Sequence, residues 1–585
     1  MRNRKRLISQ SCLAALTGGF LGLFGGVGVT PVHASLQFDL KLTKIDGLYD
    51  VPPEAAKSVI ATATDQAFAL DLNALVTSPN NNGFQSTIGD FTQSPSGPSP
   101  LTGVIAPAGD VVNWPPLPPT QIVGVGPYNA YGSSAGTPSS GNLLGVGIRA
   151  AKMQPEETPP DNWPREPGDP GYTSPFSATI GKITFTGGGG GGSGGGITQI
   201  QFNPKTKTGG GYAEDAALWA EQVTDPINYP SGSKNGLTGT IVTNSPAPQI
   251  LSGGNITMSY DTAVAVRPSA THNIGTLTNA AGKSLYVIGP GTLNINGAQN
   301  HGAGAKLIVN DGTVNLNTDA GPSARNLALT VNGSALVNLN DIQHLDSITI
   351  NGPSNVKVAP TFPGGHSRVV VTNSFTMQGN ASPTGRYDTD NAAMVVMNPG
   401  AGRTQLDNLE AQVKSGRGNY DENYILDYSG PGITSQYVRN YNVTQGFDLI
   451  QVNVISNSDL YDVLEYNYST FAGQPVNPNS ILLKVTWCGD ITLDGIVDAD
   501  DYALIDSGFL GLLPGYSGII IGDLDLNGVV DGDDYALMDT SFLFQTGPMK
   551  KSYKQAAVPI PEPGGLALAG ATLSVLLGAR RRRAG

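Results

Sequence analysis

The sequence predicts a mainly β protein, with a β-sandwich-like region at the N-terminus, a parallel β-solenoid in the middle and a small α-helical domain near the C-terminus. Three observations lead to this fold class. Segments that alternate apolar and polar residues recur between residues 36 and 202, as in half-buried strands. Pairs of apolar residues then return about every 20 residues. Finally, an aspartate-rich loop with an apolar helical pattern behind it occurs twice, 33 residues apart.

The first 34 residues have the features of a secretory signal peptide. Four basic residues between positions 2 and 6 precede an apolar, glycine-rich run over 13–29, and Val32-His33-Ala34 forms a small-residue cleavage site. The glycines that interrupt the run argue against a retained membrane anchor. We therefore expect the chain to be exported and cut after Ala34.

Residues 35–245 are predicted to form an irregular β-sandwich-like region. Alternating segments begin at Leu36, Ile180 and Ile197, and long loops rich in Pro, Ser and Gly, such as 95–120, lie between them. The order of strands and loops loosely resembles cohesin-like and other secreted β-sandwich modules.

Residues 246–400 are predicted to form a parallel β-solenoid. Apolar pairs recur at intervals of 22, 22, 19 and 21 residues, at Leu285/Val287, Leu307/Val309, Leu329/Val331, Ile348/Ile350 and Val369/Val371. Second short strands follow at 293–296, 314–317, 337–340 and 356–358. One coil of about 20 residues with two or three strands is typical of a solenoid turn, whose apolar residues are buried only when neighbouring turns stack. A β-sandwich with coincidental spacing is the alternative.

Asparagines share the period of these strands. They fall at Asn296, Asn317 and Asn340 after the second strands, and at Asn310, Asn332 and Asn351 after the first ones. Stacked amides hydrogen-bond from one layer to the next, as in other stacked β-structures. We therefore expect asparagine ladders along the solenoid.

Residues 401–487 are predicted to cap the solenoid and connect it to the next domain. The segment 405–414 has a helical pattern, whereas 422–430 and 481–487 have the composition of strands. This run is similar to a segment that precedes a duplicated aspartate motif in planctomycete-type surface proteins. Cys488 is the only cysteine left after export, so the mature chain forms no internal disulfide.

Residues 488–545 contain the duplicated aspartate motif. Twelve aspartates lie between Cys488 and Thr540, without a Lys, Arg or Glu among them. The second loop has Asp523, Asp525, Asn527, Val529, Asp531 and Asp534 at positions 1, 3, 5, 7, 9 and 12, and the first has Asp490, Thr492, Asp494, Ile496, Asp498 and Asp501. These are the ligand positions of an EF-hand loop, where six to eight oxygens surround Ca²⁺ and a glycine turns the chain at position 6.

The two loops differ at position 3. Thr492 brings a hydroxyl without charge where the second loop has Asp525, so we expect two Ca²⁺ sites, the first weaker. Amphipathic helices are expected behind both loops, and none before the first, because 481–487 is strand-like. A pair of acidic turns that bind no metal is the alternative.

The doubled loop–helix unit resembles a type I dockerin. That resemblance implies Ca²⁺-dependent folding and docking to a cohesin-like domain on another protein. Dockerins of cellulosomes recognise their partners with Ser/Thr-type pairs at positions 10–11 and often basic residues at 17–18. Here these positions hold Ala499-Asp500, Gly532-Asp533, Asp506-Ser507 and Asp539-Thr540, which argues against a cellulosomal partner.

The C-terminus is predicted to be a linker over 546–560 and a sorting segment over 561–585. Pro561-Glu562-Pro563 precedes an apolar run over 564–579 and four arginines. As a helix this run spans roughly 24 Å, slightly short of a ~30 Å hydrocarbon core. The segment resembles a PEP-CTERM signal, which implies processing by an exosortase-type enzyme and delivery to the cell surface or extracellular matrix. A plain tail anchor is the alternative, and either one limits membrane contact to this segment.

Composition narrows the function classes. Charged residues are 14% of the chain and the formal net charge is −13, which disfavours nucleic-acid binding and suits cations. Glycoside hydrolysis needs paired carboxylates, but residues 222–409 contain no glutamate. Asp319, Asp341 and Asp346 could still gather on one face of the solenoid.

We therefore expect an exported, surface-associated, non-catalytic adhesion or scaffold protein. Its sandwich and solenoid would form a stalk or a surface for polysaccharide, and its dockerin-like domain would be a calcium-dependent docking module. The alternative is a polysaccharide lyase or glycoside hydrolase with its site on the solenoid, and a purely structural matrix component is a third reading.

Overall fold

The computed structural model describes the chain from residue 35 to residue 546 with several gaps. The described ranges are 35–77, 81–96, 134–139, 142–149, 176–187, 196–204, 218–221, 240–243, 246–360 and 368–546. The predicted signal peptide, almost all of the linker and the PEP-CTERM-like segment lie outside these ranges. In the described part of the chain, no helix is both long and apolar enough to span a membrane.

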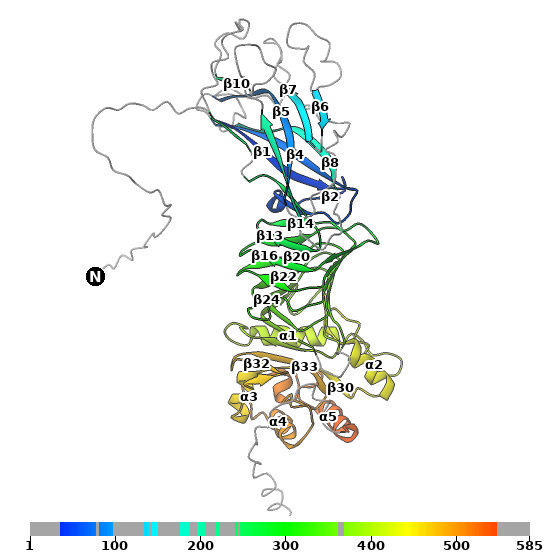
Figure 1. The fold of residues 1–585 in the computed structure, drawn as a ribbon. Coiled ribbons are helices and arrows are strands. Elements are labelled where there is room, and N and C mark those ends of the chain that lie inside the picture. The colour runs from blue at the N-terminus through cyan, green and yellow to red at the C-terminus, as the bar shows by residue number, and fades with distance from the viewer. Residues whose placement is uncertain are drawn as a thin grey trace, which may run out of the picture.

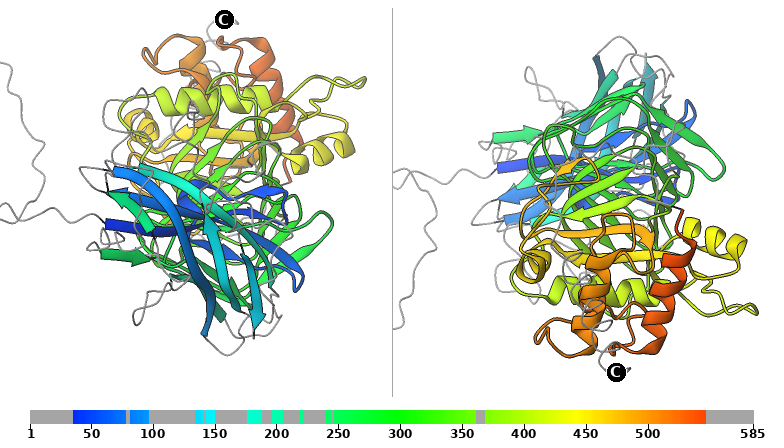
Figure 2. Two further views of the ribbon diagram at one scale, coloured as in Figure 1. Left: turned by 90° about the horizontal axis from the view of Figure 1, so that it is seen from above. Right: turned by 90° about the horizontal axis from the view of Figure 1, so that it is seen from below.

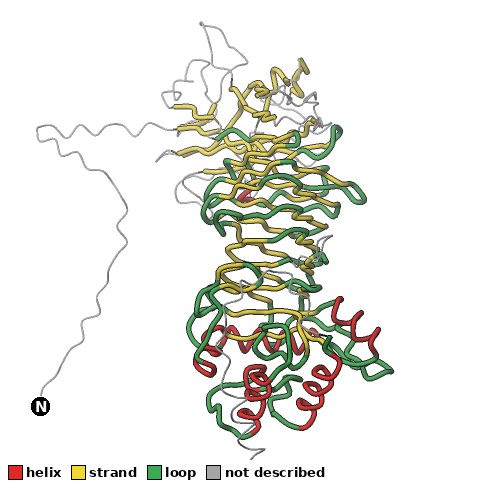
Figure 3. Tube along the Cα trace, turned by 60° about the horizontal axis from the view of Figure 1, so that its bottom comes forward, coloured by secondary structure: helices red, strands yellow, loops and turns green. Residues whose placement is uncertain are grey.

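The protein is mainly β, and a parallel β-solenoid of about six turns forms its middle. Figure 1 shows the N-terminal sheets at one end of this column and a group of helices at the other. The strands of the solenoid stack as parallel layers, and the α-helices lie at the C-terminal end (Figure 3).

Three ladders of parallel strands form the faces of the solenoid. The first comprises β14 (Thr262–Val264), β17 (Ser284–Val287), β20 (Ala305–Val309), β22 (Leu327–Val331), β24 (Gln343–Ile350), β26 (Val369–Met377) and β28 (Ala393–Val396). The second comprises β15 (Thr271–Ile274), β18 (Thr292–Ile295), β21 (Thr313–Leu316), β23 (Leu336–Leu339), β25 (Asn355–Val358), β27 (Arg386–Asp388) and β29 (Gly432–Thr434). The third comprises β13 (Asn255–Met258), β16 (Thr276–Asn279) and β19 (Gln299–His301). The second ladder therefore includes β29, which lies beyond the predicted solenoid boundary at residue 400.

The predicted periodicity is confirmed for the first four apolar pairs. Leu285 aligns with Leu307, Leu307 with Leu329 and Leu329 with Ile348, and all four side chains are buried in one core. Each strand buries alternate residues, so stacking of the turns removes these side chains from water.

The fifth predicted pair, Val369 and Val371, was placed in the wrong register. Ile348 and Ile350 align with Phe375 and Met377, whereas Val370 and Val371 align with Gln343 and His344. The reason is the length of the two strands, eight residues in β24 and nine in β26, so each carries two inward-facing clusters. The β-branched valines at 369–371 are the stronger strand signal in the sequence, but Phe375 and Met377 are the pair that continues the repeat.

The predicted asparagine ladders are confirmed. Asn317 donates to Asn296 and Asn340 to Asn317, over 2.5 and 2.7 Å. A second ladder joins Asn310, Asn332 and Asn351, with side-chain amides 2.7 and 2.8 Å from the acceptor oxygens. A third, which the sequence analysis did not predict, joins Asn273, Asn294, Asn315 and Asn338 at 2.6–2.8 Å.

Two sheets meet at the N-terminal end. One comprises β1 (Ser35–Ile45), β2 (Tyr49–Asp50), β4 (Gln66–Thr77), β8 (Phe176–Gly187) and β11 (Thr240–Thr243). The other comprises β5 (Asn81–Ser96), β6 (Ser134–Ser139), β7 (Asn142–Arg149), β9 (Gly196–Pro204) and β10 (Leu218–Glu221), and it continues through β12 (Gln249–Ser252) and β3 (Ser58–Ile60) into the first face of the solenoid. Phe38 and Phe202, one from each sheet, pack edge to face at 5.2 Å in a shared core. The cohesin-like sandwich itself stays a prediction.

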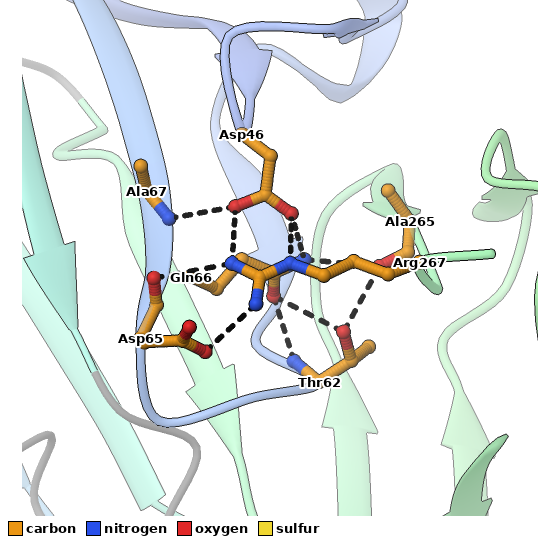
Figure 4. Close-up of polar contacts among 7 residues, drawn as sticks. All are labelled: Asp46, Thr62, Asp65, Gln66, Ala67, Ala265 and Arg267. Atoms are coloured by element: carbon orange, nitrogen blue, oxygen red, sulfur yellow. Dashed lines mark hydrogen bonds and ion pairs between the residues drawn. The ribbon is translucent and has the colours of Figure 1, made fainter. Parts of the chain in front are cut away.

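A polar junction joins the N-terminal region to the first solenoid turns. Arg267 donates two hydrogen bonds of 2.8 Å to Asp46 and a third of 2.8 Å to Asp65 (Figure 4). Gln66 donates to the carbonyl oxygen of Ala265 over 3.0 Å. Burial alone would raise the pKa of Asp46, but the hydrogen bonds from Arg267 and its positive charge hold that pKa below the ordinary value. Because its charges are paired with one another, we interpret this network as a structural contact between the N-terminal region and the solenoid.

The C-terminal region covers the last turn of the solenoid. It contains α1 (Thr404–Gly416), α2 (Gln436–Gln445), β30 (Ile450–Ser456), α3 (Asn457–Leu464), β31 (Thr470–Phe471), β32 (Gln474–Pro475), β33 (Ile481–Trp487), α4 (Ala499–Phe509), η4 (Gly518–Ile521) and α5 (Gly532–Phe544); the remaining short helix, η1 (Pro53–Ala55), lies near the N-terminus. The predicted helix over 405–414 and strand over 481–487 are confirmed as α1 and β33. Strands β33 and β30 extend the first solenoid face by antiparallel pairing on β28.

The strand predicted over 422–430 is wrong. Only one isolated bridge, between Tyr420 and Leu426, forms there. The carboxylate of Asp421 accepts hydrogen bonds from the backbone of Asn423 and Ile425, and that of Asp427 accepts from its own neighbours. These side chains take the N–H groups that a strand ladder would use, so the apolar pattern alone was misleading.

The central ladder gives a direct test of the solenoid. Replacing Asn315 with Ala removes its bond to Asn294 and leaves the amide of Asn338 without its acceptor. We expect the free energy of unfolding to fall by about 1–2 kcal/mol. Chemical denaturation measures this, with Asn300→Ala, an exposed asparagine in β19, as the control that changes stability little. Equal effects of the two substitutions would contradict the ladder's role.

Candidate metal centre

The two aspartate loops lie at the end of the molecule where the solenoid stops. The first follows β33 directly and leads into α4, whereas the second follows η4 and leads into α5. Seen along the column, α4 and α5 lie beside each other at this end (Figure 2). The helices predicted after each loop are therefore present, and none precedes the first loop.

Both loops turn in the same way. Leu493 and Gly495 in the first loop, and Leu526 and Gly528 in the second, have positive φ angles between 61° and 105°. The glycines make this sharp turn at position 6 without the steric cost that a Cβ atom brings. The turn folds the loop back, so that positions 1, 3 and 12 approach one another.

A capping box ends each loop. Asp498 and Asp531 are the N-caps of α4 and α5, and in each box the aspartate three residues later accepts from the N-cap backbone. The carboxylate of Asp534 also accepts from Leu524 and Asp525 over 2.7 and 3.2 Å. Position 12 is therefore fixed against positions 2 and 3 by the backbone, and negative charge lies at the positive end of each helix.

The second loop gathers three carboxylates around one point. Asp523, Asp525 and Asp534 each offer an oxygen, and the three oxygens lie within 4.8 Å of one another. Within the described ranges, histidine, cysteine and acidic side chains converge in this way at this loop only. Asp523 is 3% exposed, and its Oδ2 accepts from Gly528 over 3.0 Å. Its other oxygen, Oδ1, is buried without a hydrogen-bond partner.

The unpaired oxygen indicates which kind of ligand would suit this loop. A buried carboxylate oxygen without a partner costs free energy, and converging carboxylates add repulsion. Burial raises the pKa of Asp523 to about 6, and the neighbouring charges of Asp534 and Asp525 act in the same direction. Burial also raises the pKa of Asp534. A hard divalent cation with oxygen ligands would remove both costs, so the donor set fits Ca²⁺.

The first loop is more deeply buried but differently bonded. Asp490 and Asp501 are 0% and 1% exposed, and Thr492 is 3% exposed. Asp490 accepts hydrogen bonds from the hydroxyl of Thr486 and from the backbone of Gly495 and Asp494. Asp501 accepts from Ile491 and Thr492, each over 2.9 Å. Burial raises the pKa of Asp490 to about 6, despite the nearby charge of Lys484.

The other predicted ligands lie toward the surface. Asp494, Ile496 and Asp498 in the first loop are half-buried, as are Asp525 and Asp531 in the second. Asn527 and Val529 are exposed, and Asn527 donates to Asp525 over 2.9 Å. The structure therefore brings positions 1, 3 and 12 of the second loop together, whereas positions 5, 7 and 9 lie closer to the protein surface.

Residues outside the motif hold both loops, and the sequence analysis missed them. In the first loop Tyr468 donates to the carbonyl of Thr492 over 2.9 Å, and Lys484 donates to that of Leu493 over 3.3 Å. In the second loop Lys414 of α1 donates to the carbonyl of Leu526 over 2.7 Å. One signal was available for the first loop: Thr486 lies four residues before Asp490, where the second loop has apolar Ile519.

Helices α4 and α5 present a two-fold-related surface. The hydroxyl of Tyr502 donates to Asp539 over 2.6 Å, and that of Tyr535 donates to Asp506 over the same distance. Edge-to-face ring pairs, Tyr502 with Phe542 and Tyr535 with Phe509, repeat the symmetry. The aspartates at position 17 of each motif are therefore engaged between the helices. Phe509 and Phe542 remain 59% and 46% exposed.

The solenoid carboxylates have structural partners. Asp319 accepts from the ring Nδ1 of His344 over 2.6 Å and from its backbone over 2.9 Å. Asp341 accepts from Ile342, and Asp346 accepts from Asn373. The three residues are not assembled into one converging group, and each supports its own turn.

Comparisons with known proteins gave no match: no family model, no curated protein and no solved structure is similar to this chain.

The raised pKa values predict a pH dependence in the absence of metal. Asp490 and Asp523 titrate near 6 in the folded chain against an ordinary value of 3.8, so the folded state binds more protons than the unfolded state between these values. The resulting stabilisation is complete below about pH 4 and is lost as the pH rises through 6. With a chelator present, we expect these two carboxyls to lower the thermal midpoint as the pH rises from about 4 to about 6.5. Asp523→Asn should weaken this dependence, and an unchanged profile would contradict the assignment.

Proposed function

We propose that the chain is an exported, non-catalytic scaffold protein, whose C-terminal helical module is stabilised by calcium at the second aspartate loop and serves for docking. The observation that carries the proposal is the group formed by Asp523, Asp525 and Asp534 together with the unpaired, buried Oδ1 of Asp523. Carboxylates that must be buried close together, without cations beside them, are a donor set for a divalent ion.

The solenoid supports the scaffold reading. Its layers are joined by backbone ladders and three asparagine ladders, and its core is continuous with that of the C-terminal region. Such a column holds the N-terminal sheets and the helical module at opposite ends (Figure 1). The exported location, the PEP-CTERM-type sorting by an exosortase and contact with polysaccharide belong to this proposal on the strength of the sequence.

The docking face is the outer side of α4 and α5. Tyr502 and Tyr535 tie the two helices together, so the exposed rings beside them are held in place before any partner binds. Preorganised aromatic side chains are favoured anchors in interfaces. The dockerin resemblance makes a cohesin-like domain on another protein the partner class, and the acidic residues at positions 11 and 17 favour a partner with basic groups opposite them.

Calcium titration followed by thermal unfolding tests the metal half of the proposal. At a free calcium concentration of 100 times Kd, the free energy of unfolding should rise by about 2.7 kcal/mol. Asp523→Asn should abolish most of this gain, because it removes the charge at position 1. Asp533→Asn is the matched control, since it removes the same charge next to a ligand position and should retain the gain. A thermal midpoint that does not change when calcium is added would contradict the metal assignment.

A second assay separates scaffold from enzyme. The exported chain is incubated with plant and algal polysaccharides, and both sedimentation with insoluble polysaccharide and release of reducing ends or unsaturated products are measured. The proposal predicts retention on at least one polysaccharide without product. Product release that is lost in Asp319→Asn would favour the lyase or hydrolase instead.

A further inference from the structure

We propose that the first aspartate loop is satisfied by the protein itself, with Lys484 as its positive charge, and that the chain binds one divalent ion, at the second loop. This inference rests on the proposed calcium site and differs from the expectation of two sites. It assigns Lys484 and Thr486 as the residues that decide the stoichiometry.

The first step is a comparison of the two aspartates at position 1. Both oxygens of Asp490 accept hydrogen bonds: Oδ1 from the backbone of Asp494 over 3.0 Å, and Oδ2 from Gly495 over 2.8 Å and from Thr486. In Asp523, Oδ2 likewise accepts from Gly528 and the backbone of Asn527 acts on the carboxylate, but no hydroxyl matches Thr486 and Oδ1 is buried without a partner of full hydrogen-bond geometry. A carboxylate has about four lone-pair sites, and a metal ligand must offer one of them toward the ion. The hydroxyl of Thr486 takes one more of these sites in Asp490, whereas Asp523 keeps Oδ1 for an ion.

The second step concerns the charge beside each loop. Lys484 lies in β33, and its ammonium donates to the carbonyl of Leu493 at position 4 of the first loop over 3.3 Å. Its charge acts favourably on the carboxylate of Asp490. At the equivalent place 33 residues later the chain has Ser517, and the equivalent of Thr486 is Ile519. In the second loop Lys414 of α1 donates to the equivalent carbonyl, that of Leu526, over 2.7 Å. A lysine charge is among the main groups that favour the charged form of Asp490 but not among those for Asp523, and no side-chain hydroxyl takes the place of Thr486.

The third step concerns position 3. The hydroxyl of Thr492 is 3.5 Å from Oδ1 of Asp490, and the carbonyl of Thr492 accepts from Tyr468. Thr492 is 3% exposed, so the first loop is closed by the segment that carries Tyr468. In the second loop the position-3 residue is Asp525, half-buried and part of the converging group. An ion entering the first loop would have to displace protein contacts and approach a fixed ammonium group, both of which lower affinity.

The two loops then have different tasks. The first joins the helical module to the end of the solenoid sheet whether or not calcium is present, since Asn453 of β30 also donates to the carbonyl of Asp490 over 2.9 Å. The second responds to the ion and transmits the change to α1 through Lys414. The helical module thereby stays attached to the solenoid while its second loop binds the ion.

Isothermal titration of the full exported chain with calcium tests the stoichiometry. We expect one ion per chain for the wild type, one ion with Kd changed less than about threefold for Asp490→Asn, and a loss of affinity of at least about 100-fold for Asp523→Asn. Two ions in the wild type, or a site lost in Asp490→Asn, would overturn the inference. No binding at all would instead overturn the proposed function on which it rests.

The double variant Lys484→Met/Thr486→Val tests the cause. Removing the ammonium and the hydroxyl donor frees a lone pair on Oδ2 of Asp490 and leaves its charge unbalanced, while the backbone bonds from Asp494 and Gly495 remain. A second ion should then bind to a chain that shows the far-ultraviolet spectrum of the wild type. A folded double variant that still binds one ion would overturn the role of Lys484 and Thr486. If the double variant does not fold, Asp490→Asn alone decides the stoichiometry.

Discussion

One hydrogen-bonded sheet runs through the described structure from the N-terminal region to the aspartate loops. It begins at β6 and β7, passes through β9, β12 and β3 into the first face of the solenoid, and ends at β33 and β30. A solenoid turn cannot bury its apolar residues alone, and an open end would expose strand edges. The continuous sheet meets both requirements, because each end of the column is extended and covered by another part of the same chain.

The metal centre depends on this sheet. Strand β33 pairs with β28 of the solenoid and ends at Trp487, three residues before Asp490. On the other side, α1 covers the last turn and holds the second loop through Lys414. Glu410 of α1 is packed against Gly518, just before the second loop, and burial raises its pKa to about 8. The charged form of Glu410 is therefore disfavoured between α1 and η4. A cation bound at the neighbouring second loop would act on this same region.

The periodic features of the fold could be predicted from the sequence. Repeats of apolar pairs and asparagines translate into stacked layers, because each layer repeats the same contacts. The helix α1, strand β33 and the positions of both loops follow from local pattern in the same way. The choice between Val369/Val371 and Phe375/Met377 could not be predicted, since both are apolar pairs and only the pairing with β24 selects one. The turn at Asp421 and Asp427 was missed because side chains replaced strand partners.

The candidate site shows the same division. The motif predicts twelve candidate ligand positions, but the loops differ through residues distant in sequence or outside the motif, such as Lys414, Tyr468 and Lys484. Their contacts are tertiary, and a loop pattern carries no information on which neighbours fill its lone pairs. Burial likewise decides which carboxylates are costly: Asp523 and Asp531 are both aspartates in one loop, but only Asp523 has an oxygen among the buried atoms without partners.

The central claim is that an ion at the second loop is coupled to the end of the solenoid. Hydrogen–deuterium exchange of the protein, with and without calcium, measures this coupling residue by residue. The account predicts slower exchange with calcium both in the second loop with α5 and in α1, and little change in the middle turns of the solenoid. Protection confined to the loop and α5, with α1 unchanged, would contradict it.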